Sequence, residues 1–167
     1  MAFKMSVQKY SGKISEVELG SGESCIKIGG ENILPFYNFD GESTNTQKIG
    51  VEILDIYPEN WTQEIKDLYK DVANDSVKWA KYIEENIKPD FICLKFEGAD
   101  PNGMDKSPEE CADLAKEVAS NVSLPIVIAG TGNFEKDAKV FEKVAQSVDG
   151  YNCLFMSATE ENYKGIG

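Results

Sequence analysis

Four short, mostly apolar runs alternate with stretches in which apolar residues recur every three or four positions. The runs cover residues 49–56, 90–96, 124–129 and 152–156. Continuous apolar runs are typical of parallel strands that are buried on both faces of a sheet. Amphipathic helices between such strands supply the crossover connections that a parallel sheet needs. The pattern therefore predicts an α/β fold with a parallel βα repeat over residues 48–167.

The expected helices follow the strands at regular intervals. Apolar residues at helical spacing fall within residues 61–72, 77–87, 111–122 and 138–148, and residues 157–163 resemble the first turn of one more helix. Ser107, Pro108 and Glu110 mark one helix start, because they supply a cap, a first-turn proline and a capping-box glutamate. The acidic pairs at 109–110 and 160–161 are therefore interpreted as first-turn residues that favour the helix dipole.

The first 47 residues follow a different pattern. Two short apolar segments within residues 14–30 flank a Gly-Ser-Gly sequence at 20–22, which predicts a β-hairpin. An aromatic connector, residues 34–39, comes next, and we expect it to pack beneath the domain. We divide the chain into a hairpin with its connector at 1–47 and four βα units at 48–167.

The number of βα units limits the architecture. A complete (β/α)8 barrel, or TIM barrel, needs about 250 residues, whereas this chain has 167 and ends just after an apparent helix start. We therefore expect the N-terminal half of a TIM barrel, preceded by a β-hairpin and apparently truncated at the start of the next helix. Unpaired strand edges recruit other chains, so the isolated half-barrel should form an oligomer through its open sheet edges.

Charge and composition exclude several classes of function. The chain carries 29 acidic residues against 17 lysines, a net charge of −12, and it has neither histidine nor arginine. A polyanionic partner selects basic patches, so nucleic acid and anionic membrane surfaces are excluded as partners. The lack of histidine removes imidazole bases and ligands, and the lack of arginine removes bidentate anion recognition.

The cysteines and the hydropathy pattern favour a reduced, cytoplasmic protein. Cys25, Cys93, Cys111 and Cys153 form no C-x-x-C pair, so they are interpreted as reduced thiols rather than cluster or zinc ligands. No segment has the length and apolarity of a signal peptide or a membrane span. We predict no metal site and no catalytic residue in this chain.

Candidate binding residues lie in the loops that follow the strands, where parallel α/β folds bind their ligands. Three loops supply the candidates for cofactor binding: Gly98, Ala99, Asp100; Gly130, Thr131, Gly132; and Ser157, Ala158, Thr159. Two simpler interpretations stay open, a type I turn at residues 100–103 and a tight βα turn at 130–132. Lys95 is a further alternative, because a lysine inside a barrel can form a Schiff base.

Four segments resemble a known family. Residues 34–42 (LPFYNFDGE), 94–101 (LKFEGADP), 127–130 (VIAG) and 161–164 (ENYK) are similar to the small, or delta, subunit of the corrinoid iron–sulfur protein of the acetyl-CoA decarbonylase/synthase complex. The similarity runs in the same order through essentially the whole chain. The first two segments are the most specific.

The resemblance implies both a fold and a role. It implies a TIM barrel paired with a large corrinoid iron–sulfur subunit that carries the [4Fe–4S] cluster and the cobalamin, which lies between the two subunits. It also implies that a separate methyltransferase delivers a methyl group from methyltetrahydrofolate. The assembly would then pass that group to acetyl-CoA synthase in the Wood–Ljungdahl pathway, the one-carbon route of carbon fixation in anaerobes. The expected function is a non-catalytic scaffold subunit whose loops cover a shared cobalamin.

Two alternatives remain. A related barrel could be a pterin-dependent corrinoid methyltransferase, with Asp55, Asp100 and Asn133 as the available pterin-binding residues. The chain could also be an inactive barrel fragment. Binding of methyltetrahydrofolate without a partner would favour the methyltransferase, whereas binding of a cobalamin-loaded large subunit would favour the scaffold.

Overall fold

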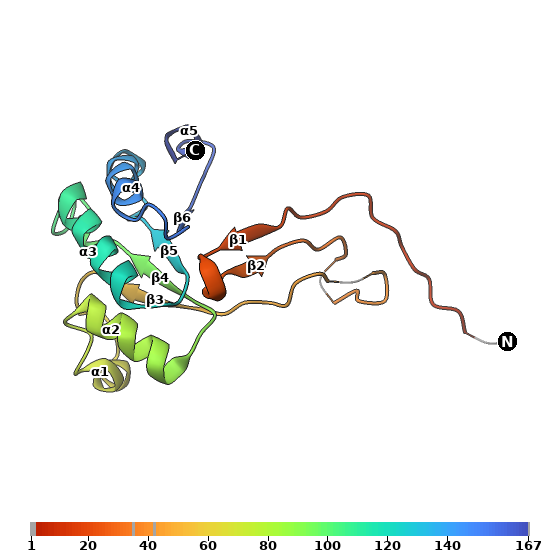
Figure 1. Cartoon of the computed structure of the whole chain (residues 1–167), viewed down its shortest axis with the longest axis horizontal. Helices are drawn as coiled ribbons and strands as arrows, with labels where there is room; N and C mark the ends of the chain where they lie inside the picture. The colour runs from red at the N-terminus through yellow and green to blue at the C-terminus, as the bar shows by residue number, and fades with distance from the viewer. Residues whose placement is uncertain (1–2, 35, 42, 167) are drawn as a thin grey trace.

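The protein is an α/β chain with one parallel sheet and a separate antiparallel hairpin. The computed structural model describes residues 3–34, 36–41 and 43–166. In the hairpin, β1 (Val17–Leu19) pairs with β2 (Ile26–Ile28), and a 3-10 turn, η1 (Gly22–Ser24), joins them. The sheet contains β3 (Gly50–Leu54), β4 (Phe91–Lys95), β5 (Ile126–Ala129) and β6 (Leu154–Met156), all parallel and in chain order (Figure 1). The predicted parallel sheet and hairpin are thus confirmed.

The helices alternate with these strands. The longer ones are α1 (Gln63–Tyr69), α2 (Ser76–Tyr82), α3 (Pro108–Asn121) and α4 (Phe134–Ser147), and the short elements are η2 (Ile83–Ile87), η3 (Glu97–Ala99) and α5 (Tyr163–Ile166). The predicted capping box of α3 is present, with Ser107 and Glu110 bonding each other's backbone N–H groups. In the described part of the chain, no helix combines the length and apolarity needed to cross a bilayer.

One face of the sheet packs against the helices. Ile53, Leu94 and Ile128 point to the helix side of the sheet, and all three are fully buried in the main core. Trp79 of α2 joins this core and packs edge-on against Trp61, with ring centroids 5.5 Å apart. Burial of each such large side chain contributes about 1.5–3 kcal/mol.

The hairpin covers part of the opposite face. Leu19 is 1% exposed and forms a second buried cluster with Cys93, Val127 and Ala129. Gly20 N–H donates to the carbonyl of Asn152 at 3.1 Å, and the Asn152 side chain donates back to the Gly20 carbonyl at 2.8 Å. Because Asn152 precedes β6, the hairpin lies at the amino-terminal end of the sheet, away from the strands' carboxyl ends.

The aromatic connector does not pack beneath the domain, so that prediction was wrong. Phe36 is 92% exposed, and the connector extends away from the sheet beside the hairpin (Figure 1). The residues after the connector bond to the end of the hairpin, since Thr44 Oγ1 donates to the Gly30 carbonyl and Asn45 Nδ2 to the Gly29 carbonyl. Within the 34–42 motif, Pro35 and Glu42 lie outside the described residues.

Candidate functional site

The predicted site loops lie at one end of the sheet, beyond the carboxyl ends of its strands. Strands β3 to β6 are parallel neighbours, so the segments that follow them leave the sheet on the same side. These segments are residues 55–58, 97–101, 130–133 and 157–160. The hairpin covers the other end, and the candidate site therefore lies on the end that the hairpin leaves open.

A buried carboxylate joins the first two loops. Asp55 follows β3, and its side chain is fully buried. Its Oδ1 accepts from the Gly98 N–H at 2.8 Å, and its Oδ2 lies 3.0 Å from Lys106 Nζ. Lys106 also donates to the Asp55 carbonyl at 2.6 Å. Asp55 therefore links the first two loops through hydrogen bonds and presents no free carboxylate to a ligand.

The hydrogen bond from Gly98 to Asp55 explains why the second loop has a glycine at this position. A Cβ on Gly98 would lie 2.6 Å from Asp55 Oδ2, so only glycine fits beside the carboxylate. Ala99 is fully buried, whereas Asp100 is half-buried and starts a turn. Asp100 Oδ1 accepts from both the backbone and the side chain of Asn102, and Gly103 N–H donates to the Asp100 carbonyl. The turn interpretation of residues 100–103 thus describes the loop.

The Gly-Thr-Gly loop is folded around a second buried carboxylate. Asp137 is 5% exposed and accepts from Thr131 N–H at 2.8 Å, Thr131 Oγ1 at 2.9 Å and Gly132 N–H at 2.9 Å. A Cβ on Gly130 would lie 2.4 Å from the Asp137 carboxyl carbon. The N–H groups of Thr131 and Gly132, which could otherwise bind an external anion, are thus already bonded within the chain.

A buried amide organises the loop after β6. Asn162 is 9% exposed, and its Oδ1 accepts from Thr159 N–H at 2.6 Å. Its Nδ2 donates to the Ser157 carbonyl at 3.0 Å. Ser157 and Ala158 remain exposed, and Thr159 is half-buried. This loop therefore presents small side chains on a fixed backbone.

The nine predicted binding residues thus fall into two groups. Gly98 and Ala99 are buried and shape the second loop from within. The other seven are exposed or half-buried at the loop surface: Asp100, Gly130, Thr131, Gly132, Ser157, Ala158 and Thr159.

Sequence reasoning missed the residues that hold these loops. Asp137, Lys106 and Asn162 were not singled out. Asp137 lies in the first turn of α4, where the helix dipole alone explains an acidic residue, so its position gave no separate signal.

The side chains proposed for pterin binding already form hydrogen bonds within the protein. Asp55 is closed off by Gly98 and Lys106, as described above. Asn133 caps α4, with its Oδ1 accepting from Lys136 N–H at 3.1 Å. Asp100 uses Oδ1 within its own turn. The three side chains do not form an open polar pocket.

Lys95 lies on the sheet face away from the helices. Its neighbours Leu94 and Phe96 are fully buried in the helix-side core, so strand alternation turns Lys95 to the other face. Its Nζ lies 3.7 Å from Glu97 Oε2, and the side chain is 34% exposed. The amine is therefore paired with Glu97, and the described residues form no apolar enclosure around it of the kind that activates a Schiff-base lysine.

The cysteines form no disulfide with one another, and burial affects three of them. All four cysteines are free, and burial raises the pKa of Cys93 to about 11, of Cys111 to about 12 and of Cys153 to about 11. Across residues 3–34, 36–41 and 43–166, no three His, Cys, Asp or Glu side chains gather as a metal-holding group.

Comparisons with known proteins all match this chain to one family. A family model described as "CO dehydrogenase/acetyl-CoA synthase delta subunit" matches residues 16–167. The delta subunit of the acetyl-CoA decarbonylase/synthase complex from Methanocaldococcus jannaschii is 35% identical over 96% of this chain and 41% of its own length. The delta subunit from Methanothermobacter thermautotrophicus is 32% identical over 93% of this chain and 40% of its own length.

A third relative agrees with these two. The delta subunit from Archaeoglobus fulgidus is 30% identical over 94% of this chain and 36% of its own length. The chain thus spans about two-fifths of the length of the curated relatives that it matches. Because the family model covers nearly the whole chain, the protein belongs to the CO dehydrogenase/acetyl-CoA synthase delta subunit family.

Proposed function

We propose that residues 48–167 form the N-terminal half of a TIM barrel and residues 1–47 a separate hairpin and connector. The strand register supports this. Glu52, Cys93, Val127 and Leu154 are paired side by side across the sheet, as are Lys95, Ala129 and Met156 one level higher. In a barrel, residues on this face of the strands point inward and fill the interior. The helices pack on the other face, as the outer ring of a barrel does.

The function that best fits the site is that of a scaffold subunit of a corrinoid methyl carrier. In this role the carboxyl-end loops cover a cobalamin held by a large subunit. The methyl group travels from methyltetrahydrofolate, through a methyltransferase, to acetyl-CoA synthase. The observation that carries the proposal is the family match over residues 16–167.

The chemistry of the loops fits a covering role. A corrin ring has an apolar face and a rim of neutral amide side chains, which need small contact residues and uncharged polar partners. Gly132, Ala158 and Thr159 offer such groups, and the nearby carboxylates of Asp55 and Asp137 are buried and satisfied. The residues that would contact the cofactor are therefore the exposed or half-buried members of the predicted set. Bound cobalamin would itself supply the methyl-transfer chemistry.

The methyltransferase alternative has less support. A pterin site needs several free polar side chains, whereas Asp55 already bonds the backbone of the second loop and Asn133 the backbone of α4. Assignment as an inactive fragment would require that the folded loops bind nothing. The same experiment separates the three functions.

The test is binding of the cobalamin-loaded large subunit to the whole chain, followed by the visible absorption spectrum of the cobalamin. We expect a complex and a spectral shift, because the covering loops exclude water from one face of the corrin. Methyltetrahydrofolate alone should give no binding heat. Pterin binding without a partner would instead establish the methyltransferase, and absence of both would leave the inactive fragment.

A matched pair of variants locates the contact. Ala158→Trp places a large ring on the exposed loop after β6, and it should weaken the complex and reduce the spectral shift. Ala145→Trp places the same ring on an exposed position of α4. It should change neither. Equal effects of the two variants would contradict the proposed orientation.

A further inference from the structure

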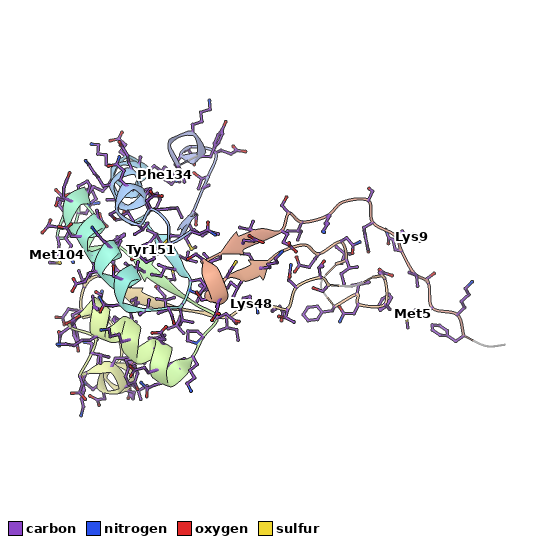
Figure 2. All side chains as sticks on the ribbon, in the orientation of Figure 1. Met5, Lys9, Lys48, Met104, Phe134 and Tyr151 are labelled. Carbon is purple, nitrogen blue, oxygen red and sulfur yellow. The ribbon has the colours of Figure 1, made fainter. Side chains whose placement is uncertain are left out.

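The N-terminal arm, defined as residues 3–13, has no role in the functions described above. It is extended and precedes β1 without belonging to any described helix or strand. Figure 2 shows Met5 and Lys9 at one end of the molecule and Met104 and Phe134, next to the candidate site loops, at the other. A contact made by the arm would therefore be separate from a contact made by the site loops.

The arm has the side-chain pattern of a strand with one apolar face. Phe3, Met5 and Val7 alternate with Lys4, Ser6 and Gln8, and alternate residues of an extended chain share one side. Phe3 is 89% exposed, Met5 51% and Val7 57%. An apolar strand face that is left in solvent is a recurrent sign of a surface that pairs with another chain.

The backbone of the arm is bonded on one side. Gln8 N–H donates to Asp40 Oδ1 at 2.9 Å, so this N–H points toward the connector. In an extended segment, N–H groups two residues apart point the same way. Those of Lys4 and Ser6 therefore face the connector's side, and those of Met5 and Val7 face outward. The outward groups form an unpaired strand edge.

Charge identifies the kind of surface that the edge would meet. Three of the 17 lysines and none of the 29 acidic residues precede Ile14. The arm is thus basic in a strongly acidic chain, and its electrostatic complement is a surface that carries carboxylates. Two arms pairing with each other would bring their lysines together, so pairing between copies of the arm is disfavoured.

We propose that the arm adds as an edge strand to an exposed, acidic sheet edge of the large subunit. The outward N–H groups of Met5 and Val7 bond that edge, Phe3, Met5 and Val7 pack on the apolar face of its sheet, and Lys4 and Lys9 approach its carboxylates. This mode of recognition combines backbone bonds for affinity with alternate side chains for specificity. The inference rests on the proposed function, because that function supplies the partner.

The main test compares two prolines in the whole chain, with the cobalamin-loaded large subunit as the probe. Val7→Pro removes an outward N–H and should weaken binding by about tenfold more than Val7→Ser, which loses only the side chain. Ser6→Pro removes an N–H on the connector side and should leave affinity close to that of the wild type. Equal losses from the two prolines would overturn strand addition.

Side chains and charge give independent readouts. Phe3→Ser with Met5→Ser should weaken binding by roughly tenfold, whereas Ser6→Ala with Gln8→Ala, on the other side of the strand, should not. Lys4→Glu with Lys9→Glu should weaken binding at low salt and have much less effect at high salt. Unchanged affinity in both apolar and charge variants would overturn the proposal.

The outcomes also separate this inference from the proposed function. If the wild-type chain fails to bind the large subunit, both fall. If the wild-type and Val7→Pro chains bind equally and shift the cobalamin spectrum equally, only the arm inference falls. Self-association of the chain alone that is lost in Val7→Pro would assign the arm to a second copy and overturn the choice of partner.

Discussion

Asp55 and Asp137 are the residues on which the geometry of two site loops depends. Each is buried, each accepts at least one hydrogen bond from a backbone N–H, and each faces a glycine whose Cβ would collide with it. Asp55 forms an ion pair with Lys106, whereas Asp137 accepts hydrogen bonds from Thr131 and Gly132 of the adjacent loop. A buried carboxylate with several donors is stable only while the donors remain in place.

Removal of the Asp137 carboxylate should therefore release its loop. Asp137→Ala leaves the N–H groups of Thr131 and Gly132 without partners, and we expect a loss of about 2–3 kcal/mol in the free energy of unfolding. Urea denaturation measures the loss. Glu135→Ala, an exposed position in the same helical turn, is the control and should stay within about 0.5 kcal/mol of the wild type.

The close contact between Gly130 and Asp137 predicts coupling between the two positions. Gly130→Ala alone should cost about 1–3 kcal/mol, because the added methyl group displaces the carboxylate. In the Asp137→Ala background the same change should cost much less. A double-mutant cycle by urea denaturation measures this coupling, and simple additivity of the two losses would contradict the contact.

The buried thiols predict a selective and pH-dependent reactivity. Cys93, Cys111 and Cys153 stay protonated at pH 8 because burial raises their pKa to about 11, 12 and 11. We expect these three to react slowly with a maleimide until the protein unfolds. Peptide mass spectrometry after brief labelling checks this, with a urea-unfolded sample as the control.

The raised pKa values of the three thiols also predict that the folded protein loses stability at high pH. A thiol with a raised folded-state pKa binds its proton more tightly in the folded protein, so unfolding is opposed below the unfolded pKa. That stabilisation declines as pH rises from about 8.5, the ordinary thiol pKa. Urea midpoints should therefore fall between pH 8 and 10, and conversion of the three cysteines to alanine should reduce this slope.

At the scale of elements, sequence periodicity located the strands and helices because their apolar faces are repeated. The runs at 90–96 and 124–129 became β4 and β5, and the capping signals before residue 108 placed the start of α3. The connector was misplaced because aromatic content indicates burial on average, whereas Phe36 lies on an extension with no sheet beneath it.

Loop interiors were harder to predict than strands. Gly98 and Gly130 were predicted to bind a cofactor, whereas the groups that lie against them are Asp55 and Asp137 of the same chain. Lys106 reaches Asp55 across 51 residues. A single sequence contains no periodic signal for such a pair, so the loops were located correctly and their internal bonds were not.

The α3 cap gives a prediction at the scale of one element. Ser107→Ala removes the acceptor for Glu110 N–H and should destabilise the protein by about 1 kcal/mol. The Ser107 N–H also holds the pKa of the Glu110 carboxyl below its ordinary value. The contribution of this carboxylate is thus present at neutral pH and declines as pH falls below about 4. Urea titrations of Ser107→Ala and Glu110→Gln at neutral and acidic pH measure both effects.

For the whole molecule, the described sheet ends in two strands that each have one neighbour. β3 and β6 occupy the edges in the order β3-β4-β5-β6. Open parallel edges next to an uncovered face favour association. We expect the isolated chain to form dimers or larger assemblies, as measured by light scattering across micromolar concentrations. A monomer at every concentration would contradict the half-barrel, and Ser6→Pro should leave the association unchanged.

The contacts of the hairpin also bear on how the chain folds as it is made. Asn152 bonds the carbonyls of Glu18 and Gly20, which precede it by 134 and 132 residues. A ribosome releases the hairpin long before Asn152 exists, and contacts between such distant residues form slowly. The hairpin is thus made well before its partner residue, and until Asn152 is in place Leu19 and the strand surface that it covers remain exposed to solvent.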